Sequence, residues 1–457
     1  MTTLDAIQPA TGEVIDRHPV TSPDARDALI DAAAETQRRW AATSLATRAD
    51  WLRRVADRLD DRRAPLADLM AREMGKPRAQ GRAEVDKCAW VCRYYAEHGA
   101  DFLADDRADT DARRSYVTYR PLGLLLAIMP WNFPIWQVLR CAAPALMAGN
   151  GVILKHAPNV PGCALAIEEL LRIDGHPQHL LRTVLLAGND EAEALIDDRR
   201  IRAVTLTGST RAGRAVAARA GRQLKPIVLE LGGSDPYLIL ADADVEQAAA
   251  LCVQSRLHNS GQTCIAAKRF IVVDAVRAAF ERAVIDAMRA RTMGDPFDDA
   301  VDVGPMARVD LRDALHAQVT RSLDAGARLM LGGVCPDGPG AFYPPSVLTD
   351  VAPGMPAFDE ELFGPVAAIV PVADEDEAIA RANETVYGLG AAVFTRDVAR
   401  GERIAADRLE AGCCFVNDFV RSDPRLPFGG IKDSGHGREL GREGIRAFCN
   451  VKTVCVA

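Results

Sequence analysis

The stretch from residue 123 to residue 233 constrains the fold most, because short apolar runs alternate there with segments of helical periodicity. The apolar runs lie at 124–128, 151–155, 183–186, 203–207 and 226–231, and helical segments at 162–172 and 192–197 lie between them. Alternating strands and helices build a parallel sheet with helices on both faces. The sequence therefore predicts an α/β fold with a doubly wound, Rossmann-type sheet.

The sequences on either side of this stretch predict further units. Residues 22–101 have helical periodicity, and Ser22 and Pro23 form an N-cap with proline at the first helical position. A second α/β run follows Gly233, with strands expected at 270–273 and 363–371, whereas 331–345 is expected to be a surface loop. Two alternating, strand-like segments at 115–120 and 449–457 fit neither run.

From this pattern we predict three units. Residues 1–105 and 121–231 form a cofactor-binding domain, residues 232–436 form an α/β catalytic domain, and residues 106–120 and 437–457 form a small β oligomerisation element. A terminal edge strand needs a cover, so we expect a homodimer or homotetramer. Folding of the tail back onto its own chain is the alternative.

Composition excludes several functional classes. The chain has 457 residues, of which 48% are hydrophobic and 26% charged, which excludes a wholly disordered chain. A net charge of −8 argues against non-specific binding to nucleic acid. No apolar run is long enough to span a membrane, and no signal peptide is apparent. Eleven cysteines without framework spacing suggest reduced thiols and a cytoplasmic protein.

Four short motifs contain side chains suited to catalysis or binding. Cys264 ends the glycine-containing sequence NSGQTC, and Glu230 ends an apolar strand before two glycines. The sequence TGSTRAG at 207–213 follows a strand and opens a helix, where free backbone N–H groups bind phosphate. Asn132 lies between bulky residues in PWNFP at 130–134. Each motif, taken alone, fits a purely structural role as well or better.

Together these motifs, in this order, resemble the aldehyde dehydrogenase superfamily along nearly the whole chain. Further matches are PATGE at 9–13, EMGKP at 73–77, EELFGP at 360–365, PFGGIK at 427–432 and SGHGRE at 434–439. The resemblance implies that Cys264 is the nucleophile and that Asn132 and the backbone N–H of Cys264 hold the oxyanion. It also implies that Glu230 activates the water that hydrolyses the thioester.

The resemblance also implies a nicotinamide cofactor. The residues expected to bind it are Trp131, Lys155, Pro158, Gly208, Ser209, Gly213, Glu361 and Phe363. Relatives that prefer NAD often have Glu at the position of Pro158, where it repels the 2′-phosphate of NADP. With proline there and Lys155 nearby, both NADP and NAD are acceptable and NADP is slightly favoured. No metal is expected, because Cys88 and Cys92 have no further ligand pair at suitable spacing.

For the substrate, the chain looks most like the bacterial succinate-semialdehyde dehydrogenases. Arg140 and Ser422 match the residues of that group that bind the substrate's carboxylate, and Arg421 and Arg425 add positive charge. His258 stands where well-characterised members of that group have a second arginine, and a neutral histidine binds a carboxylate more weakly.

The leading hypothesis is oxidation of succinate semialdehyde to succinate with NADP or NAD. Oxidation of a broader range of aldehydes is the nearest alternative, with Arg140 then serving structure. A relative that forms acyl-coenzyme A is disfavoured because Glu230 is present to activate water. A catalytically idle structural or binding protein is disfavoured by the combination of Cys264, Glu230 and Asn132.

Overall fold

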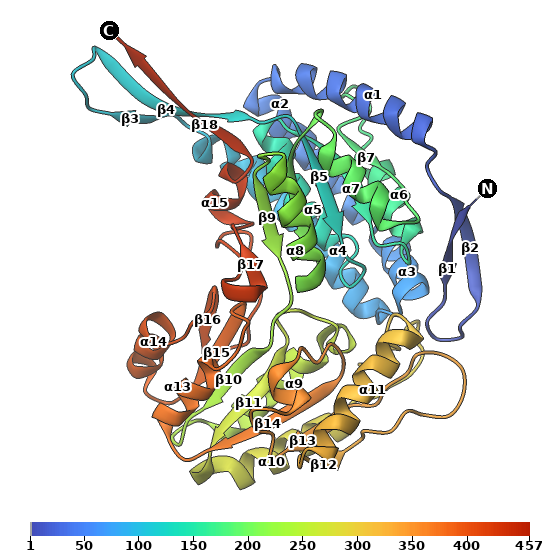
Figure 1. Cartoon of the computed structure of the whole chain (residues 1–457), viewed down its shortest axis with the longest axis vertical. Coiled ribbons are helices and arrows are strands. Elements are labelled where there is room, and N and C mark those ends of the chain that lie inside the picture. The colour runs from blue at the N-terminus through green and yellow to red at the C-terminus, as the bar shows by residue number, and fades with distance from the viewer. Residues whose placement is uncertain (1) are drawn as a thin grey trace.

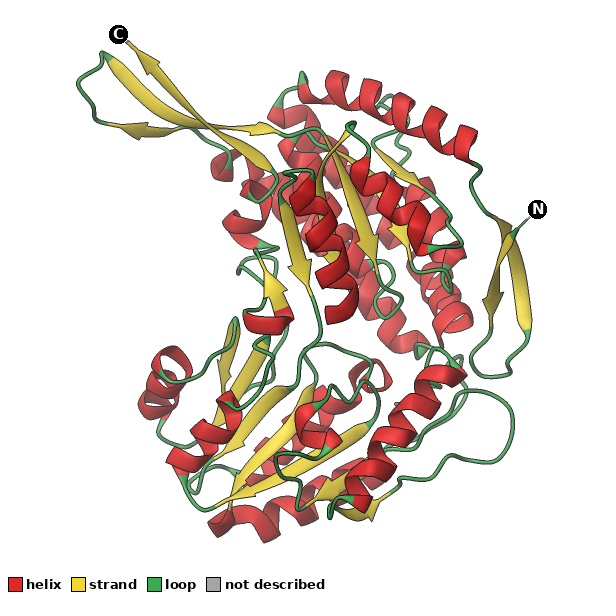
Figure 2. Ribbon diagram, in the orientation of Figure 1, coloured by secondary structure: helices red, strands yellow, loops and turns green. Residues whose placement is uncertain are grey.

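The computed structural model describes residues 2–457, which form two lobes and a projecting β arm (Figures 1 and 2). The first lobe is built around a six-stranded sheet. Its strands, in spatial order, are β17 (Gly435–His436), β9 (Ile227–Glu230), β8 (Ile201–Thr207), β5 (Leu124–Met129), β6 (Gly151–His156) and β7 (Leu181–Thr183). All neighbouring pairs are parallel except β17 with β9. Numbered along the chain, the five parallel strands lie in the order 5-4-1-2-3, which is that of a doubly wound sheet.

Helices cover both faces of this sheet. They are α1 (Pro23–Ala41), α2 (Leu45–Asp61), α3 (Arg63–Met74), α4 (Arg78–Phe102), α5 (Trp136–Ala148), α6 (Pro161–Leu170), α7 (Asn189–Asp197), α8 (Thr210–Arg222) and α15 (Gly441–Arg446). Leu125 and Ala127 of β5 face the core shared with α4, α5 and α6, whereas Leu124 and Leu126 face the core shared with α1, α7 and α8. Because successive side chains of a strand point to opposite faces, a strand buried on both faces is continuously apolar.

The second lobe contains a seven-stranded sheet. Its strands, in spatial order, are β12 (Arg328–Leu331), β13 (Ser346–Thr349), β14 (Val366–Val372), β11 (Ala267–Val273), β10 (Asp235–Ile239), β15 (Gly390–Phe394) and β16 (Cys413–Val416). Only β12 pairs antiparallel. The helices α9 (Val245–Leu257) and α10 (Asp274–Arg289) cover one face. The other face is covered by α11 (Val309–Asp324), α12 (Pro356–Asp359), α13 (Glu375–Asn383) and α14 (Val398–Asp407).

The arm is a three-stranded antiparallel sheet of β3 (Asp106–Ala108), β4 (Arg114–Pro121) and β18 (Cys449–Val456), with β4 in the middle. It extends away from the first lobe, at the upper left of Figure 1. A separate hairpin of β1 (Thr3–Ile7) and β2 (Val14–Pro19) lies at the side of the first lobe. No helix within residues 2–457 has the length and apolar character required to cross a membrane.

Two details differ from the sequence-based expectations. The strand predicted at 183–186 is β7, which ends at Thr183, because Leu185 exchanges hydrogen bonds with Thr21 instead of continuing along β6. Residues 435–448 lie with the first lobe, although we assigned them to the catalytic domain and to the oligomerisation element. In this segment β17 pairs with β9, and Leu440 and Ile445 join the apolar core around α4 and α5. The remaining domain boundaries stay predictions.

Candidate active site

Four of the predicted site residues lie at, or shortly after, the carboxyl ends of neighbouring parallel strands. Asn132 follows β5, Lys155 lies at the end of β6, Gly208 follows β8, and Glu230 is the last residue of β9. In doubly wound sheets, ligands bind at this edge. Here the edge faces the second lobe, because the chain passes directly from β9 to β10 (Figure 1).

Cys264 follows a tightly wound loop at the end of α9. Three consecutive residues have left-handed backbone conformations: Asn259 at φ 57°, Ser260 at φ 54° and Gly261 at φ 76°. A Cβ atom on Gly261 would lie 2.3 Å from the carbonyl oxygen of Gly364, so only glycine fits there. Such strained backbone persists where the surrounding structure fixes it, and it is common at functional sites.

Asn132 helps to fix this loop. Its side-chain amide donates to the backbone carbonyl of Gln262 at 3.0 Å, and its backbone carbonyl accepts from the side chain of Asn259 at 2.7 Å. Lys268 donates to the backbone carbonyls of Thr263 at 3.0 Å and Cys264 at 2.6 Å. Lys268 of the second lobe therefore holds the peptide bonds before and after Cys264, and Asn132 of the first lobe holds the peptide bond between Gln262 and Thr263.

Cys264 is a partly buried thiol. Burial raises its pKa to about 12, although the charges of Lys268 and Arg140 oppose the rise. Among the described residues, no backbone acceptor takes the N–H of Cys264, so that N–H remains free to donate to a ligand. The protein without ligands thus holds a neutral thiol beside a free backbone donor at neutral pH.

Glu230 is buried, with only 2% of its surface exposed. Neither of its carboxylate oxygens has a hydrogen-bond partner among the described residues. Burial raises its pKa well above the usual value; Arg140 opposes that rise, whereas Glu439 adds to it. A Cβ atom on Gly429 would lie 2.6 Å from a Glu230 oxygen, so the glycine leaves space for the carboxyl group.

Arg140 is paired with a carboxylate of the protein itself. Its guanidinium forms a buried salt bridge with Glu439, donates to the hydroxyl of Thr207 at 3.2 Å, and lies 5.0 Å from the ring centre of Phe428. The sequence predicts that Arg140 pairs with the carboxylate of the substrate, and that prediction takes no account of Glu439. In the structure its charge is already compensated.

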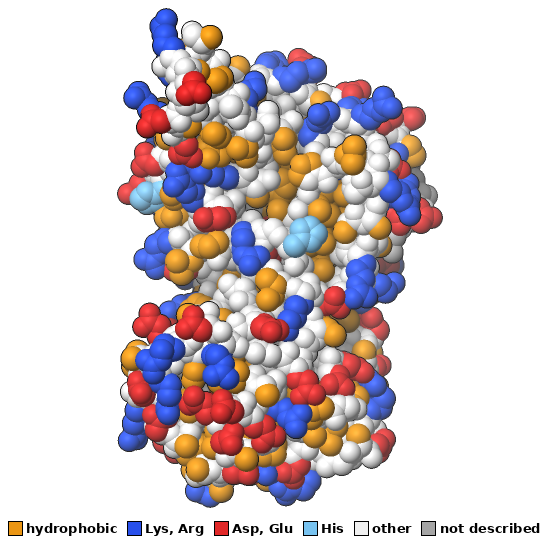
Figure 3. All heavy atoms as spheres, turned by 60° about the vertical axis from the view of Figure 1, so that its left-hand side comes forward, with side chains coloured by type: hydrophobic (Ala, Val, Ile, Leu, Met, Phe, Trp, Pro, Cys, Tyr) orange, Lys and Arg blue, Asp and Glu red, His pale blue; other side chains and the backbone are white. Residues whose placement is uncertain are grey.

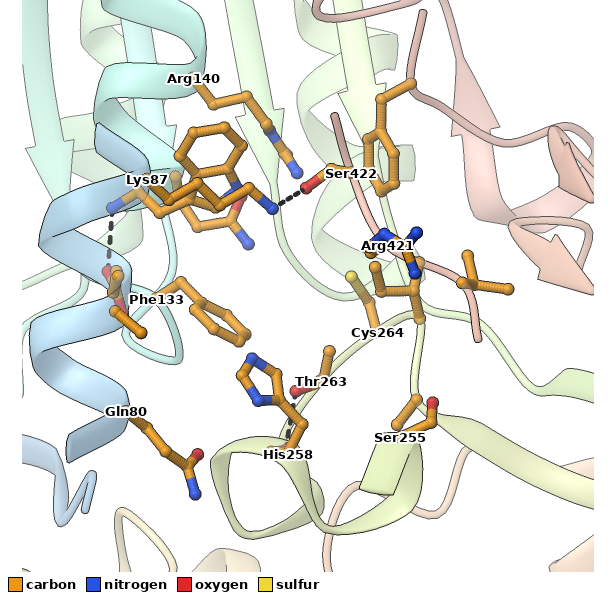
Figure 4. Close-up of a pocket in the computed structure, with 18 of the residues that line it drawn as sticks. Gln80, Lys87, Phe133, Arg140, Ser255, His258, Thr263, Cys264, Arg421 and Ser422 are labelled. Carbon is orange, nitrogen blue, oxygen red and sulfur yellow. Dashed lines mark hydrogen bonds between the residues drawn. The ribbon is translucent and has the colours of Figure 1, made fainter. Parts of the chain in front are cut away.

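A cavity of about 230 Å³ opens beside Cys264 (Figure 4). Its wall includes Lys87, Arg140, His258 and Ser422, and the Cys264 sulfur points into the space between them. The His258 ring stacks on Phe133 with 5.5 Å between ring centres. Burial, with Lys76 and Lys87 adding to it, lowers the pKa of His258 to about 4, so this ring is neutral at pH 7.

The two other cations expected near the substrate both have carboxylate partners. Arg421 lies on the wall of the cavity and pairs with Asp418 at 2.7 Å. Arg425 is mostly exposed and pairs with Asp423 at 2.6 Å, and it is not among the residues that line the cavity. Acidic and basic side chains are also intermixed over the face drawn in Figure 3.

The two glycines of the TGSTRAG motif differ in what surrounds them. A Cβ atom on Gly213 would lie 2.5 Å from Leu231, so Gly213 allows α8 to pack closely on the sheet. A Cβ atom on Gly208 would meet only Leu206, at 3.6 Å, so packing does not require glycine there. Open space therefore lies before α8, where Ser209 caps the helix by accepting from the N–H of Ala212. A phosphate group of a dinucleotide fits such a place.

Glu361, Phe363 and Trp131 lie close to the Cys264 loop. Glu361 accepts from the N–H of Gly233 at 3.2 Å, and its carboxylate lies 3.3 Å from Lys268, which also binds the carbonyl of Cys264. Phe363 makes an edge-on contact with Trp131, with ring centres 5.8 Å apart. The structure therefore brings together candidate cofactor residues from both lobes.

At the end of β6, Lys155 is half-buried and burial lowers its pKa, while Pro158 is exposed in the following turn. Both ring nitrogens of His156 are occupied, one by the carbonyl of Pro134 at 2.9 Å and one by the N–H of Ala157 at 2.8 Å. Burial lowers the pKa of His156 to about 4. Of these residues, only Lys155 offers a charge to a cofactor phosphate.

Sequence reasoning missed two residues of this site, Lys87 and Glu439. Glu439 lies in the SGHGRE motif, which was noted only as a family match. Lys87 has no local signal, because its partner Ser422 lies 335 residues away in the sequence. Cys88 and Cys92 are buried thiols of α4, and no group of three or more potential metal ligands occurs within residues 2–457.

Comparisons with known proteins give a consistent result. The sequence pattern of the Aldehyde dehydrogenase family matches residues 1–454. A probable succinate-semialdehyde dehydrogenase [NADP(+)] of Synechocystis sp. is 48% identical over 99% of this chain and 100% of its own. The succinate semialdehyde dehydrogenase [NAD(P)+] Sad of Escherichia coli is 48% identical over 98% of this chain and 97% of its own.

Solved structures are similar too. The crystal structure of succinic semialdehyde dehydrogenase from Streptococcus pyogenes in complex with NADP+ superposes with a TM-score of 0.96. It is 35% identical in sequence, and the match covers 99% of both chains. The two-lobed α/β fold, the full-length sequence match and the residues gathered around Cys264 all agree, and this chain belongs to the aldehyde dehydrogenase family.

Proposed function

We propose that this protein oxidises succinate semialdehyde to succinate with NADP or NAD. The observation that carries the proposal is the cavity beside Cys264, which has the reacting thiol at one side and cationic and hydroxyl side chains at the other. An aldehyde that also bears a carboxylate is complementary to both sides. The printed names of the relatives from Synechocystis sp. and Escherichia coli agree with this substrate.

In the proposed reaction, Cys264 gives up its proton to solvent and its sulfur attacks the aldehyde carbon, which gives a thiohemiacetal. The side-chain amide of Asn132 and the free N–H of Cys264 donate to the oxygen that becomes negative. One of the two side-chain amide protons of Asn132 is donated to the carbonyl of Gln262, which leaves the second proton for the ligand. A bound nicotinamide supplies the acceptor for the hydride that leaves the carbon.

The thioester that remains on Cys264 is then hydrolysed. We assign Glu230 as the general base that takes a proton from the attacking water. Its raised pKa supports this role, because a carboxylate with a higher pKa is a stronger base than an ordinary carboxylate. When water attacks, the carbon–sulfur bond breaks, succinate leaves, and the proton that Glu230 took from water passes to the sulfur of Cys264.

We propose that the cofactor lies along the carboxyl edge of the first sheet. Gly208 and Ser209 would hold the pyrophosphate at the start of α8, and Glu361, Phe363 and Trp131 would surround the nicotinamide and its ribose. Pro158 offers no carboxylate to repel a 2′-phosphate, and Lys155 offers a positive charge. We therefore expect both cofactors to work and NADP to be slightly preferred.

We further propose that the protein is a homodimer or homotetramer joined through the arm. The arm has few neighbours within its own chain, and Val451 on its edge strand is 62% exposed. An unpaired edge strand of this kind needs a partner. Light scattering tests this proposal: a mass near 49.3 kDa in a fully active sample would contradict it.

The free thiols of all eleven cysteines support a reducing, cytoplasmic location.

A panel of aldehydes measured with NADP and with NAD tests the proposed function. We expect kcat/KM for succinate semialdehyde to exceed that for butanal by at least about tenfold, because a buried ionic contact is lost with butanal. Comparable values for both aldehydes would favour the broad-specificity alternative. No activity with any aldehyde would favour the idle protein.

A further inference from the structure

The charged side chains around the cavity are nearly all compensated within the protein. Glu84 pairs with the buried Lys76 and also accepts from the N–H groups of Ile135 and Trp136, each at 2.9 Å. As described above, Arg140 and Arg421 each pair with a carboxylate. None of these groups requires a ligand to balance its charge.

Lys87 is different. It lies on α4 and lines the cavity, and its ammonium group donates to the hydroxyl of Ser422 at 2.7 Å and lies 4.4 Å from the ring centre of Trp136. Both contacts are with neutral groups. Two carboxylates lie near enough to influence it, and both are occupied elsewhere: Asp423 binds Arg425 at 2.6 Å and Glu84 binds Lys76.

No carboxylate of the described chain forms a salt bridge with Lys87, although Arg140 places a second positive charge nearby. Burial and this like charge together disfavour the protonated form of Lys87 and lower its pKa to about 8. A cation that is partly removed from water and has no counter-ion gains most from an anion that enters its cavity.

We propose that Lys87 is the main ionic contact for the far carboxylate of the substrate, and that Ser422 donates its hydroxyl proton to the same carboxylate. This inference rests on the proposed function and deepens it. The oxygen of Ser422 accepts from Lys87, which leaves its own proton free to donate to an acceptor in the cavity. The guanidinium of Arg140 remains paired with Glu439 and is not the contact for the substrate's carboxylate.

His258 is not an alternative cation for this task, because its ring is neutral and stacked on Phe133. Related enzymes have a second arginine at the position of His258. In this protein Lys87, on another element of the fold, supplies that positive charge. Lys87 enters from α4 in the first lobe, and Figure 4 shows its ammonium reaching Ser422 across the cavity from His258.

The test compares Lys87→Met with Arg93→Met in the full-length protein. Arg93 lies on the same helix, but it pairs with Asp57 and Asp60 at the surface and does not line the cavity. For Lys87→Met we expect KM for succinate semialdehyde to rise by about 10- to 100-fold and KM for butanal to stay within about twofold. For Arg93→Met we expect no change in either value.

Equal effects of Lys87→Met on both aldehydes, or no effect on either, would overturn the proposal. If Lys87→Met does not fold, Lys87→Gln keeps a donor for Ser422 without the charge and is expected to show the same selective loss. Lys87→Arg keeps the charge and is expected to retain the preference for succinate semialdehyde over butanal.

Inhibition of butanal oxidation by succinate separates this proposal from the proposed function. If the unaltered protein oxidises butanal but not succinate semialdehyde, the proposed function fails. The assignment of Lys87 is then supported if Lys87→Met weakens the inhibition by succinate at least about tenfold, and it is overturned if the inhibition is unchanged.

Discussion

The two sides of the cavity are built in different ways. On the reacting side, the backbone fixes the positions: Cys264 follows a loop bound to both lobes, and beside the cavity Asn132 follows β5 and Glu230 is the last residue of β9. On the opposite side, side chains from distant segments set the charge, as in the pairs Lys87–Ser422 and Arg140–Glu439.

This difference teaches where sequence motifs are informative. A motif on a strand end or a strained loop fixes the place of a residue together with its neighbours, so its chemistry can be inferred from local sequence. A cation's ability to bind a ligand depends on whether another side chain already neutralises it. The sequence around Arg140 carries no information about Glu439, which lies 299 residues later.

The largest effect is expected on the reacting side. Cys264→Ser removes the thiol that forms the thiohemiacetal, so dehydrogenase activity should fall by at least about 10³-fold. Binding of NADPH, followed by its fluorescence, should remain within about twofold, because the cofactor residues are unchanged. A Cys264→Ser protein with full activity would refute the assignment of the nucleophile.

Glu230→Gln should separate the two halves of the reaction. The first hydride transfer does not need a base for water, so a burst of about one equivalent of reduced cofactor per active site is expected. Steady-state turnover should then be slower by about 10²- to 10³-fold. Stopped-flow absorbance measures both phases. A slow first turnover without a burst would show that Glu230 acts before the thioester forms.

Arg140→Met should affect stability more than it affects ligand recognition. It leaves Glu439 buried without its partner, which costs about 3–5 kcal/mol in the free energy of unfolding. The double variant Arg140→Met/Glu439→Gln removes both charges and should recover most of that loss. Urea unfolding of the single and double variants measures the difference. A stable single variant with a KM defect confined to succinate semialdehyde would instead make Arg140 the main carboxylate contact.

The smallest effect is expected in the pH dependence of KM for succinate semialdehyde, through the charge of Lys87. The pKa of Lys87 is lowered to about 8, so its positive charge is present below pH 8 and is lost as the pH rises through that value. The groups around it that carry charge or titrate are Arg140, Cys88, Asp423 and Glu84. KM for succinate semialdehyde should therefore rise several-fold between about pH 7 and 9, whereas KM for butanal should not. The rise should be absent in Lys87→Met.

Most of the fold could be predicted from the sequence because its strands are apolar on both faces and its helices have clear starts, such as Ser22 before α1. The prediction failed where long-range contacts decide the structure. Residues 435–436 have no strand-like pattern, and they become β17 only because the end of β9 lies beside them. The early end of β7 depends in the same way on Thr21, a residue far away in the sequence.

For the site, the sequence could indicate the reacting residues and the candidate cofactor residues, because they occur in compact motifs at strand ends. It could not indicate the charge balance of the cavity. The structure shows that Arg140 is compensated, that His258 is neutral, and that Lys87 lacks an ionic partner within the described chain. These properties follow from burial and from pairs of side chains that only the folded chain brings together.

The return of residues 435–456 to the first lobe has a consequence for biosynthesis. This segment supplies β17 beside Glu230, the carboxylate of Glu439 beside Arg140, and the edge strand of the arm. A ribosome makes these residues only after every other strand of both large sheets has been synthesised. The first lobe therefore cannot finish folding until the second lobe has emerged. Until then the β9 edge of its sheet is unpaired and Arg140 lacks its partner Glu439. A nascent chain stalled before residue 435 should accordingly be protease-sensitive in the first lobe.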